Sequence, residues 1–190
     1  MTRTFIALEL DDSLRRFLSE VIHQMSQQLP DLRWVDPAGI HLTLAFLGEL
    51  PDEQLAAAMQ AADAASRQVT PFEIRLKEPG IFGSPRQPRV IWMGVEETSG
   101  SLIRLHSALN RELEQRGFEV ETRCFSPHLT LARVKQSLNA SEQQTLQRLL
   151  ASRQSSDSPR QVMRQLSVMK SELLRSGARY TRLGAYSLGQ

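Results

Sequence analysis

The sequence predicts an α+β protein built from two similar halves. The pentapeptide HLTLA occurs at residues 41–45 and again at 128–132. Strand-like and helix-like patterns alternate along the chain, and no low-complexity segment divides its 190 residues. An identical pair of pentapeptides arises by chance in roughly one chain of this length in a hundred. We therefore treat the repeat as structural, in one compact domain or two small lobes that share a core.

Each copy of the repeat has the period-2 pattern of a strand with one buried face. Leu42 and Leu44 are expected to point into the core, and His41 and Thr43 away from it. The second copy repeats this arrangement from His128 onwards. Two halves related by a pseudo-two-fold axis would bring the polar faces together across a cleft.

The other elements follow from apolar spacing, capping residues and turn residues. In chain order, we expect a strand over 4–10; a helix from Asp11 or Asp12 to Pro30; the first repeat strand to Gly48; a helix opened by Pro51; a strand over 72–76; a loop over 79–88; a strand over 90–95; a helix over 102–113; the second repeat strand; a short helix with a capping box of Ser141 and Gln144; a polar connector over 154–159; and strands over 166–169 and 179–186.

Composition narrows the class of protein. Hydrophobic residues make up 41% and charged residues 23%, which is ordinary for a globular protein. The apolar runs fall well short of the roughly 20 residues that span a bilayer. The N-terminus turns acidic too early for a signal peptide. The single cysteine, Cys124, cannot form an internal disulfide. We therefore expect a cytoplasmic protein that does not enter a membrane.

The charge of the chain indicates less about its binding partners than the composition does about its class. The formal net charge is only +2, so no strong overall field indicates nucleic-acid binding. From Ser158 onwards the balance is more basic, with six cationic residues against the single acid Glu172. These residues form either a solvated face or a rim that binds phosphate. The six are Arg160, Arg164, Lys170, Arg175, Arg179 and Arg182.

Two histidines that face each other across a cleft suit general acid–base catalysis, in which one accepts a proton and the other donates one. The threonine two residues after each histidine lies on the same face, about 7 Å along the strand. Its hydroxyl can donate to a non-bridging phosphate oxygen as charge develops. His41, His128, Thr43 and Thr130 are therefore candidate catalytic residues for in-line cleavage of a phosphodiester.

Other sites have weaker support. A catalytic zinc site needs three protein ligands, and no motif supplies a third beside the two histidines. Cys124 precedes His128 by four residues, about 13 Å in an extended chain, so we expect a small buried thiol rather than a nucleophile. We expect His106 to pack in the core and His23 to face solvent. No motif for acyl hydrolysis, for nucleoside triphosphate use or for dinucleotide binding is present.

The paired motifs His41-Leu-Thr-Leu44 and His128-Leu-Thr-Leu131 resemble those of the 2H phosphoesterases. Within that superfamily the chain resembles the bacterial RNA 2′,3′-cyclic phosphodiesterases, also called 2′-5′ RNA ligases or LigT-like proteins. The likeness runs nearly end to end. It includes the segments 4–8, 41–49, 80–82, 88–92, 126–133 and 177–181.

The resemblance implies a single bilobal domain over residues 1–190, with an antiparallel sheet and helices in each lobe and a central groove. It implies hydrolysis of a terminal 2′,3′-cyclic phosphate of RNA to a 2′-phosphate, without metal or cofactor. His41 would be the general acid, His128 the base, and Thr43 and Thr130 would hold the phosphate oxygens. With a 5′-hydroxyl in place of water, the same chemistry would join RNA ends through a 2′-5′ linkage without ATP.

The family also tends to have an aromatic residue five positions after the first histidine and an arginine five after the second. These positions hold Phe46 and Arg133. Strict strand alternation directs both away from the histidines, whereas a twist or strand end would turn them into the groove. Phe46 could then stack on a base and Arg133 could contact phosphate. For Arg86 and Arg89, solvated surface is the default expectation.

Two other functions stay open. One is a 2H enzyme for a small nucleotide, such as a cyclic phosphate on ADP-ribose or a 2′-5′ oligoadenylate. The other is a module that binds RNA ends without turnover, although binding alone does not need two titrating groups. For the leading hypothesis, we expect a monomer acting on RNA ends that carry 2′,3′-cyclic phosphates, with tRNA fragments as one candidate.

Overall fold

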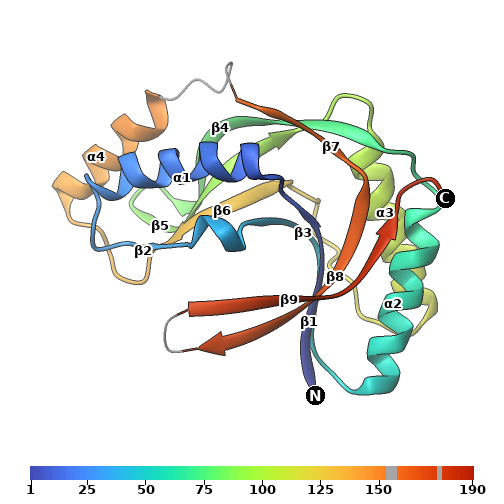
Figure 1. Ribbon diagram of the computed structural model, residues 1–190. Coiled ribbons are helices and arrows are strands. Elements are labelled where there is room, and N and C mark those ends of the chain that lie inside the picture. The colour runs from blue at the N-terminus through green and yellow to red at the C-terminus, as the bar shows by residue number, and fades with distance from the viewer. Residues whose placement is uncertain (153–157, 175–176) are drawn as a thin grey trace.

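The described residues of the protein fold into two antiparallel sheets with four α-helices (Figure 1). The computed structural model describes residues 1–152, 158–174 and 177–190, so most of the predicted connector at 154–159 lies outside the described part. The elements are β1 Thr2–Glu9, α1 Asp12–Ser26, β2 Arg33–Trp34, the 3-10 turn η1 Pro37–Gly39, β3 His41–Leu50, α2 Asp52–Ser66, β4 Phe72–Ser84, β5 Gln87–Glu96, α3 Ser101–Gln115, β6 His128–Arg133, α4 Ala140–Ala151, β7 Arg160–Met163, β8 Gln165–Leu174 and β9 Gly177–Ser187.

The two sheets each contain one copy of the repeat. The four-stranded sheet has the order β3-β1-β8-β9 and the five-stranded sheet the order β2-β6-β5-β4-β7. The first repeat strand, β3, pairs with β1, and the second, β6, pairs with β5. The predicted α+β class with antiparallel sheets is therefore confirmed.

The two halves of the chain exchange strands. The first half runs β1-α1-β2-η1-β3-α2-β4, yet β2 and β4 belong to the five-stranded sheet, where they lie beside β6 and β5. In the second half β8 returns to lie beside β1 in the four-stranded sheet. In Figure 1, α1 and α4 lie on the side of the five-stranded sheet, and α2 and α3 on the side of the other. Each half thus completes the sheet of its partner.

Both repeat strands bury their leucines as predicted. Leu42, Leu129 and Leu131 are fully buried and Leu44 is 5% exposed. They belong to a hydrophobic core that draws on both sheets and all four α-helices. Burial of four leucine side chains holds the polar faces of β3 and β6 in one orientation, because a one-residue slip would expose all four. None of the helices in the described ranges is long and apolar enough to cross a membrane.

The structure corrects two predictions about helix caps and loops. The capping box of α4 is formed by Asn139 and Glu142 rather than by Ser141 and Gln144. Asn139 is in the extended conformation, and its side chain accepts from the Glu142 amide, so the helix begins about half a turn earlier. Asp11, one of the two predicted candidates, caps α1.

Residues 79–88, predicted to be a loop, instead form the paired ends of β4 and β5 and the turn between them. Both strands tolerate proline here because the register shifts between Leu76 and Pro79 and again where Gly83 pairs with Pro88. Gly80 pairs with Trp92, and a Cβ on Gly80 would lie 2.4 Å from the indole ring. Gly80, which suggested a loop, therefore lies in a strand and leaves room for the Trp92 ring.

Candidate active site

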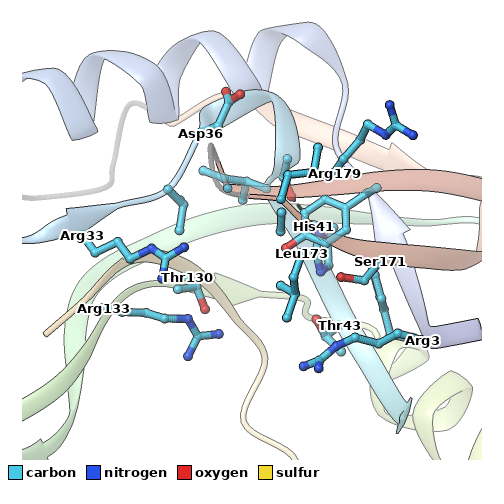
Figure 2. Close-up of a pocket in the computed structure, with 18 of the residues that line it drawn as sticks. Arg3, Arg33, Asp36, His41, Thr43, Thr130, Arg133, Ser171, Leu173 and Arg179 are labelled. Atoms are coloured by element: carbon cyan, nitrogen blue, oxygen red, sulfur yellow. Dashed lines mark hydrogen bonds between the residues drawn. The ribbon is translucent and has the colours of Figure 1, made fainter. Parts of the chain in front are cut away.

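His41 and Thr43 from β3 and His128 and Thr130 from β6 line one groove of about 960 Å³. Figure 2 shows Thr43 and Thr130 directed into it from opposite sides. The described residues include no cluster of three or more His, Cys, Asp or Glu side chains that could share a metal ion. The structure thus brings the four predicted catalytic residues together from strands 87 positions apart in the sequence.

The two imidazoles are held by the same backbone contact. Nδ1 of His41 lies 2.8 Å from the carbonyl oxygen of Gly39, and Nδ1 of His128 lies 2.7 Å from that of Ser126. A carbonyl oxygen can only accept, so Nδ1 carries the proton in both rings. Nε2 is thereby left to accept a proton when the ring is neutral or to donate one when it is charged.

Each histidine also packs against two aromatic rings, which come from different strands. Phe5 of β1 stacks on His41 with ring centroids 4.4 Å apart, and Tyr180 of β9 meets it edge-on at 5.0 Å. Phe82 of β4 meets His128 edge-on at 4.7 Å, and Trp92 lies 6.4 Å away. These contacts restrict the orientation of both imidazoles before a substrate binds.

The surroundings of His41 shift its pKa in opposing directions. Burial lowers the pKa of His41, while the Gly39 carbonyl and the carboxylate of Glu9 act in the opposite direction. Glu9 is the direct cross-strand neighbour of His41. Its carboxylate accepts from Ser167 Oγ at 2.6 Å and from two nitrogens of Arg182 at 2.7 and 2.9 Å. Burial opposes ionisation of Glu9, but these donors together lower its pKa.

Phe46 and Arg133 also line the groove, contrary to strict strand alternation. In β3, Thr43 pairs with Ala7 and Ala45 with Ile6, so Leu44 is an extra residue. A β-bulge of this kind reverses the alternation of the residues that come directly after it. Phe46 is therefore 58% exposed on the histidine side of the sheet.

The second repeat strand contains the same bulge at the same position. Thr130 pairs with Trp92 and Ala132 with Ile91, so Leu131 is the extra residue of β6. Arg133 is consequently exposed on the groove side. Phe46 and Arg133 thus face the groove because of a β-bulge, and this bulge occurs in both halves of the chain.

Sequence reasoning missed several groove residues. Arg3 and Arg33 line the groove together with Arg133, and Tyr180 and Phe5 contact His41. The guanidinium of Arg3 lies 5.0 Å from the centre of the Phe46 ring. Phe5 could have been found from the alternation of β1, in which residues 3, 5, 7 and 9 share one face. The other residues depend on strand pairings between distant segments.

The basic C-terminal residues are mostly engaged in ion pairs. Arg160 pairs with Glu73, Arg182 with Glu9, and Lys170 and Arg179 with Glu172. Arg175 lies outside the described residues. Among the other five, only Arg179 lines the groove. In the described part of this segment, Arg179 is therefore the one residue that fits the predicted phosphate-binding rim of the groove.

The remaining predicted residues lie away from the groove lining. Cys124 is exposed, so the prediction of a buried thiol is wrong; the residue lies between α3 and β6, in a connection whose neighbouring residues 121–123 are exposed as well. His106 is half-buried and stacks on Phe125 at 4.0 Å. His23 is exposed as predicted, and so are Arg86 and Arg89.

Comparisons with known proteins agree with this fold. The family model described as the 2′-5′ RNA ligase superfamily matches residues 10–172. The chain is 32% identical over 188 residues to the RNA 2′,3′-cyclic phosphodiesterase of Methanothermobacter thermautotrophicus, covering 98% of each chain. It is 36% identical over 133 residues to the protein of that name from Archaeoglobus fulgidus, covering 70% of this chain and 73% of that one.

Solved structures show the same architecture. TT0787 of Thermus thermophilus superposes with a TM-score of 0.78 at 28% identity, over 98% of both chains. E. coli LigT complexed with 3′-AMP superposes with a TM-score of 0.75 at 25% identity, over 100% of this chain and 99% of LigT. The fold and the groove therefore define a phosphoesterase of the 2H class. Within that class, the chain belongs to the 2′-5′ RNA ligase superfamily.

Proposed function

We propose that the protein hydrolyses the terminal 2′,3′-cyclic phosphate of RNA to a 2′-phosphomonoester, by acid–base catalysis with His41 and His128. The observation that carries this proposal is the equivalence of the two imidazoles. Both anchor Nδ1 on a backbone carbonyl, and both line one groove with a threonine two residues on. Relatives of nearly full length are named RNA 2′,3′-cyclic phosphodiesterases, which supports the same substrate.

In the proposed reaction, water attacks phosphorus in line with the bond to the 3′ oxygen. Nε2 of His128 takes a proton from the water, and Nε2 of His41 gives its proton to the departing 3′ oxygen. The P–O3′ bond breaks, a P–O bond to the water oxygen forms, and the product carries a 2′-phosphate and a 3′-hydroxyl. The assignment of acid and base follows the family resemblance.

The role of acid requires His41 to be protonated in the substrate complex. Burial disfavours the charged ring in the free groove, but Glu9 favours it. The anionic phosphate of a bound substrate adds to the effect of Glu9, because a negative charge near Nε2 stabilises the imidazolium. Thr43 and Thr130 would donate their hydroxyls to the equatorial oxygens of the transition state.

The same groove supports joining of RNA ends. If a 5′-hydroxyl replaces water, its attack on phosphorus breaks the same P–O3′ bond and leaves a 2′-5′ phosphodiester and a 3′-hydroxyl. The proton balance is unchanged, and no nucleotide is consumed because the cyclic phosphate supplies the reactive bond. We propose this as a second activity of the same residues.

The test is chromatographic, with a short RNA that ends in a 2′,3′-cyclic phosphate and with excess EDTA. The products are resolved into 2′- and 3′-phosphates. Wild type should form the 2′-phosphate, and His41→Ala and His128→Ala should each lose about 10³-fold in kcat. His23→Ala, which removes an exposed histidine on α1, is the matched control and should retain full activity.

Several results would contradict parts of the proposal. Turnover that both histidine variants retain would rule out the paired-histidine mechanism. Activity lost in EDTA and restored by a divalent cation would rule out a metal-free reaction. Turnover of a cyclic phosphate on ADP-ribose or of a 2′-5′ oligoadenylate, but not of RNA, would favour the small-nucleotide enzyme. Binding of RNA ends without any turnover would favour the binding module.

A further inference from the structure

The two candidate catalytic histidines differ in the residue that lies opposite each of them in its sheet. The register partner of His41 is Glu9 on β1, and the register partner of His128 is Gly94 on β5. In other respects the imidazoles are alike, because each has an Nδ1 contact with a backbone carbonyl and two aromatic neighbours. A carboxylate beside one ring and a glycine beside the other make the two repeats electrostatically unequal.

The position opposite His128 has no room for an acidic side chain. A Cβ on Gly94 would lie 2.9 Å from Cβ of Lys77 and 3.2 Å from the carbonyl oxygen of Glu78, both on the neighbouring strand β4. A larger side chain at this position would therefore displace β4. Lys77 is itself a cation, and its ammonium group pairs with Glu96 at 3.6 Å. Packing thus keeps a carboxylate away from this side of the groove.

Glu9 is held in place by donors from the two strands beyond β1. Its carboxylate accepts from Ser167 on β8 and from Arg182 on β9, and its side chain is only 22% exposed. In the sheet order β3-β1-β8-β9, Glu9 comes from the strand next to His41 and Arg182 from the opposite edge. The carboxylate therefore acts on the imidazole, and the guanidinium acts on the carboxylate.

The groove itself does not favour a charged imidazole. Among the residues that the structure describes, the charged side chains of its lining, besides the histidines, are Arg3, Arg33, Asp36, Arg133 and Arg179 (Figure 2). Four of these five are cations, and nearby cations disfavour protonation of a histidine. The carboxylate of Asp36 accepts the Ala38 amide at 2.9 Å and so caps η1. Burial lowers the pKa of His41, and the Glu9 carboxylate acts against that effect.

We propose that Glu9 is the positioning residue that keeps His41 protonated for its role as the acid, and that Arg182 limits this effect. The inference rests on the proposed function. Glu9 lies outside the groove lining, so it acts through His41 rather than on the substrate. Its negative charge stabilises the imidazolium from the neighbouring strand, and Arg182 weakens that action by pairing with it. His128, opposite Gly94, receives no such stabilisation from its register partner and therefore suits the role of base.

Titration of the imidazoles by NMR tests this effect on His41 without any substrate. Glu9→Gln keeps the shape of the side chain but removes its charge, so the titration midpoint of His41 should fall by about 0.5 pH unit. Arg182→Gln leaves the carboxylate unpaired and should move the midpoint in the opposite direction. The signal of His128 should titrate as in wild type in both variants. A mere loss of packing would not produce shifts of opposite sign.

The chain offers a matched control for the loss of an ion pair. Glu73→Gln and Arg160→Gln break an exposed pair between β4 and β7, and both variants should leave the midpoint of His41 unchanged. Glu9→Asp keeps the negative charge and should remain closer to wild type than Glu9→Gln. The His41 signal is identified as the one that His41→Asn lacks.

A comparison of leaving groups tests the role of His41 as the acid. A 2′,3′-cyclic phosphate needs a proton on the departing 3′ oxygen, whereas the p-nitrophenyl ester of 3′-deoxyadenosine 2′-phosphate releases p-nitrophenolate without one. In both reactions water attacks phosphorus and loses a proton to the base. At pH 8, Glu9→Gln should lower kcat/KM about three-fold on an RNA that ends in a 2′,3′-cyclic phosphate, which matches the shift of the midpoint. The same variant should leave kcat/KM on the nitrophenyl ester nearly unchanged.

Unchanged His41 midpoints in both Glu9→Gln and Arg182→Gln would overturn the proposal. Equal losses of kcat/KM on the two substrates would also overturn it, because Glu9 would then serve the fold or the base. Opposite midpoint shifts in a protein that turns over neither substrate would reject the proposed reaction while supporting the effect of Glu9 on His41.

Discussion

Leu44 and Leu131 occupy the same place in the two copies of the repeat, and each is the extra residue of a β-bulge. Both leucines are buried, so each bulge is anchored in the core. The repeat therefore specifies more than two strands with outward histidines. It also specifies where each strand reverses its alternation, and so which face receives the residues that follow.

Phe46 is one of the residues that the bulges turn towards the groove, and its substitution tests whether it binds substrate there. We expect Phe46→Ala to raise KM for RNA about ten-fold with little change in kcat, because an exposed ring in the groove offers a base a stacking surface. Phe46→Trp should retain the wild-type KM. Ile103→Ala, which removes an exposed side chain from α3, is the control for surface effects. A melting temperature lowered by Phe46→Ala alone would indicate a packing role instead.

Substitutions of Thr43 and Thr130 test the proposed contacts of their hydroxyls with the phosphate oxygens. Thr43→Val and Thr130→Val keep the shape of the side chain but remove the hydroxyl. Each should lower kcat about 10- to 100-fold, with a smaller effect on KM, because the hydroxyls act mainly on charge that develops in the transition state. The serine variants should retain most of the activity in steady-state assays. Valine variants with normal kcat would show that the threonines serve only the strand.

The residues around His41 show how much of the candidate site could be predicted from the sequence. The repeat and its alternation predicted the faces of His41 and His128 because strand period and core burial are local properties. Tyr180 could not be found in this way. It reaches His41 only because β9 completes the first sheet from the far end of the chain. The position of Arg33 opposite Arg133 depends in the same way on the pairing of β2 with β6.

The 79–88 segment shows a different limit. Its glycines and prolines are the residues that turns favour, yet Gly80 lies within a strand because the Trp92 ring occupies the space of a side chain. Sequence alone gives the composition of the segment but not the neighbour that explains a glycine. Likewise, β7 has four residues, and a strand that short carries too little alternation to be recognised.

The close approach at Gly80 leads to a stability prediction. Gly80→Ala would place a Cβ 2.4 Å from atoms of the outer ring of Trp92. We expect the free energy of unfolding to fall by about 1–3 kcal/mol, the usual cost of overpacking. Trp92→Phe removes that outer ring, so Gly80→Ala should be much less costly in the Trp92→Phe background. A double-mutant cycle by urea unfolding measures the difference, and equal costs in both backgrounds would contradict the clash.

His41 gives the protein a pH-dependent stability. Because burial lowers its pKa in the folded state, the unfolded chain binds more protons than the folded one between the folded pKa and the unfolded value of about 6.5. The contribution of neutral His41 is therefore complete above about pH 6.5 and is lost as the pH falls through that value towards the folded pKa. His106, whose pKa burial also lowers, acts in the same direction.

The measurement is urea unfolding at pH 8, 7, 6 and 5. Wild type should lose stability steadily below about pH 6.5, and His41→Asn should lose less over the same interval because asparagine does not titrate. His23→Asn, at an exposed position, should follow the wild-type curve. Glu9 acts in a separate window: its lowered pKa favours the folded state above the unfolded value of about 4.3, and that contribution is lost at more acidic pH. A His41→Asn curve that matches wild type from pH 8 to pH 5 would show that His41 titrates alike in both states.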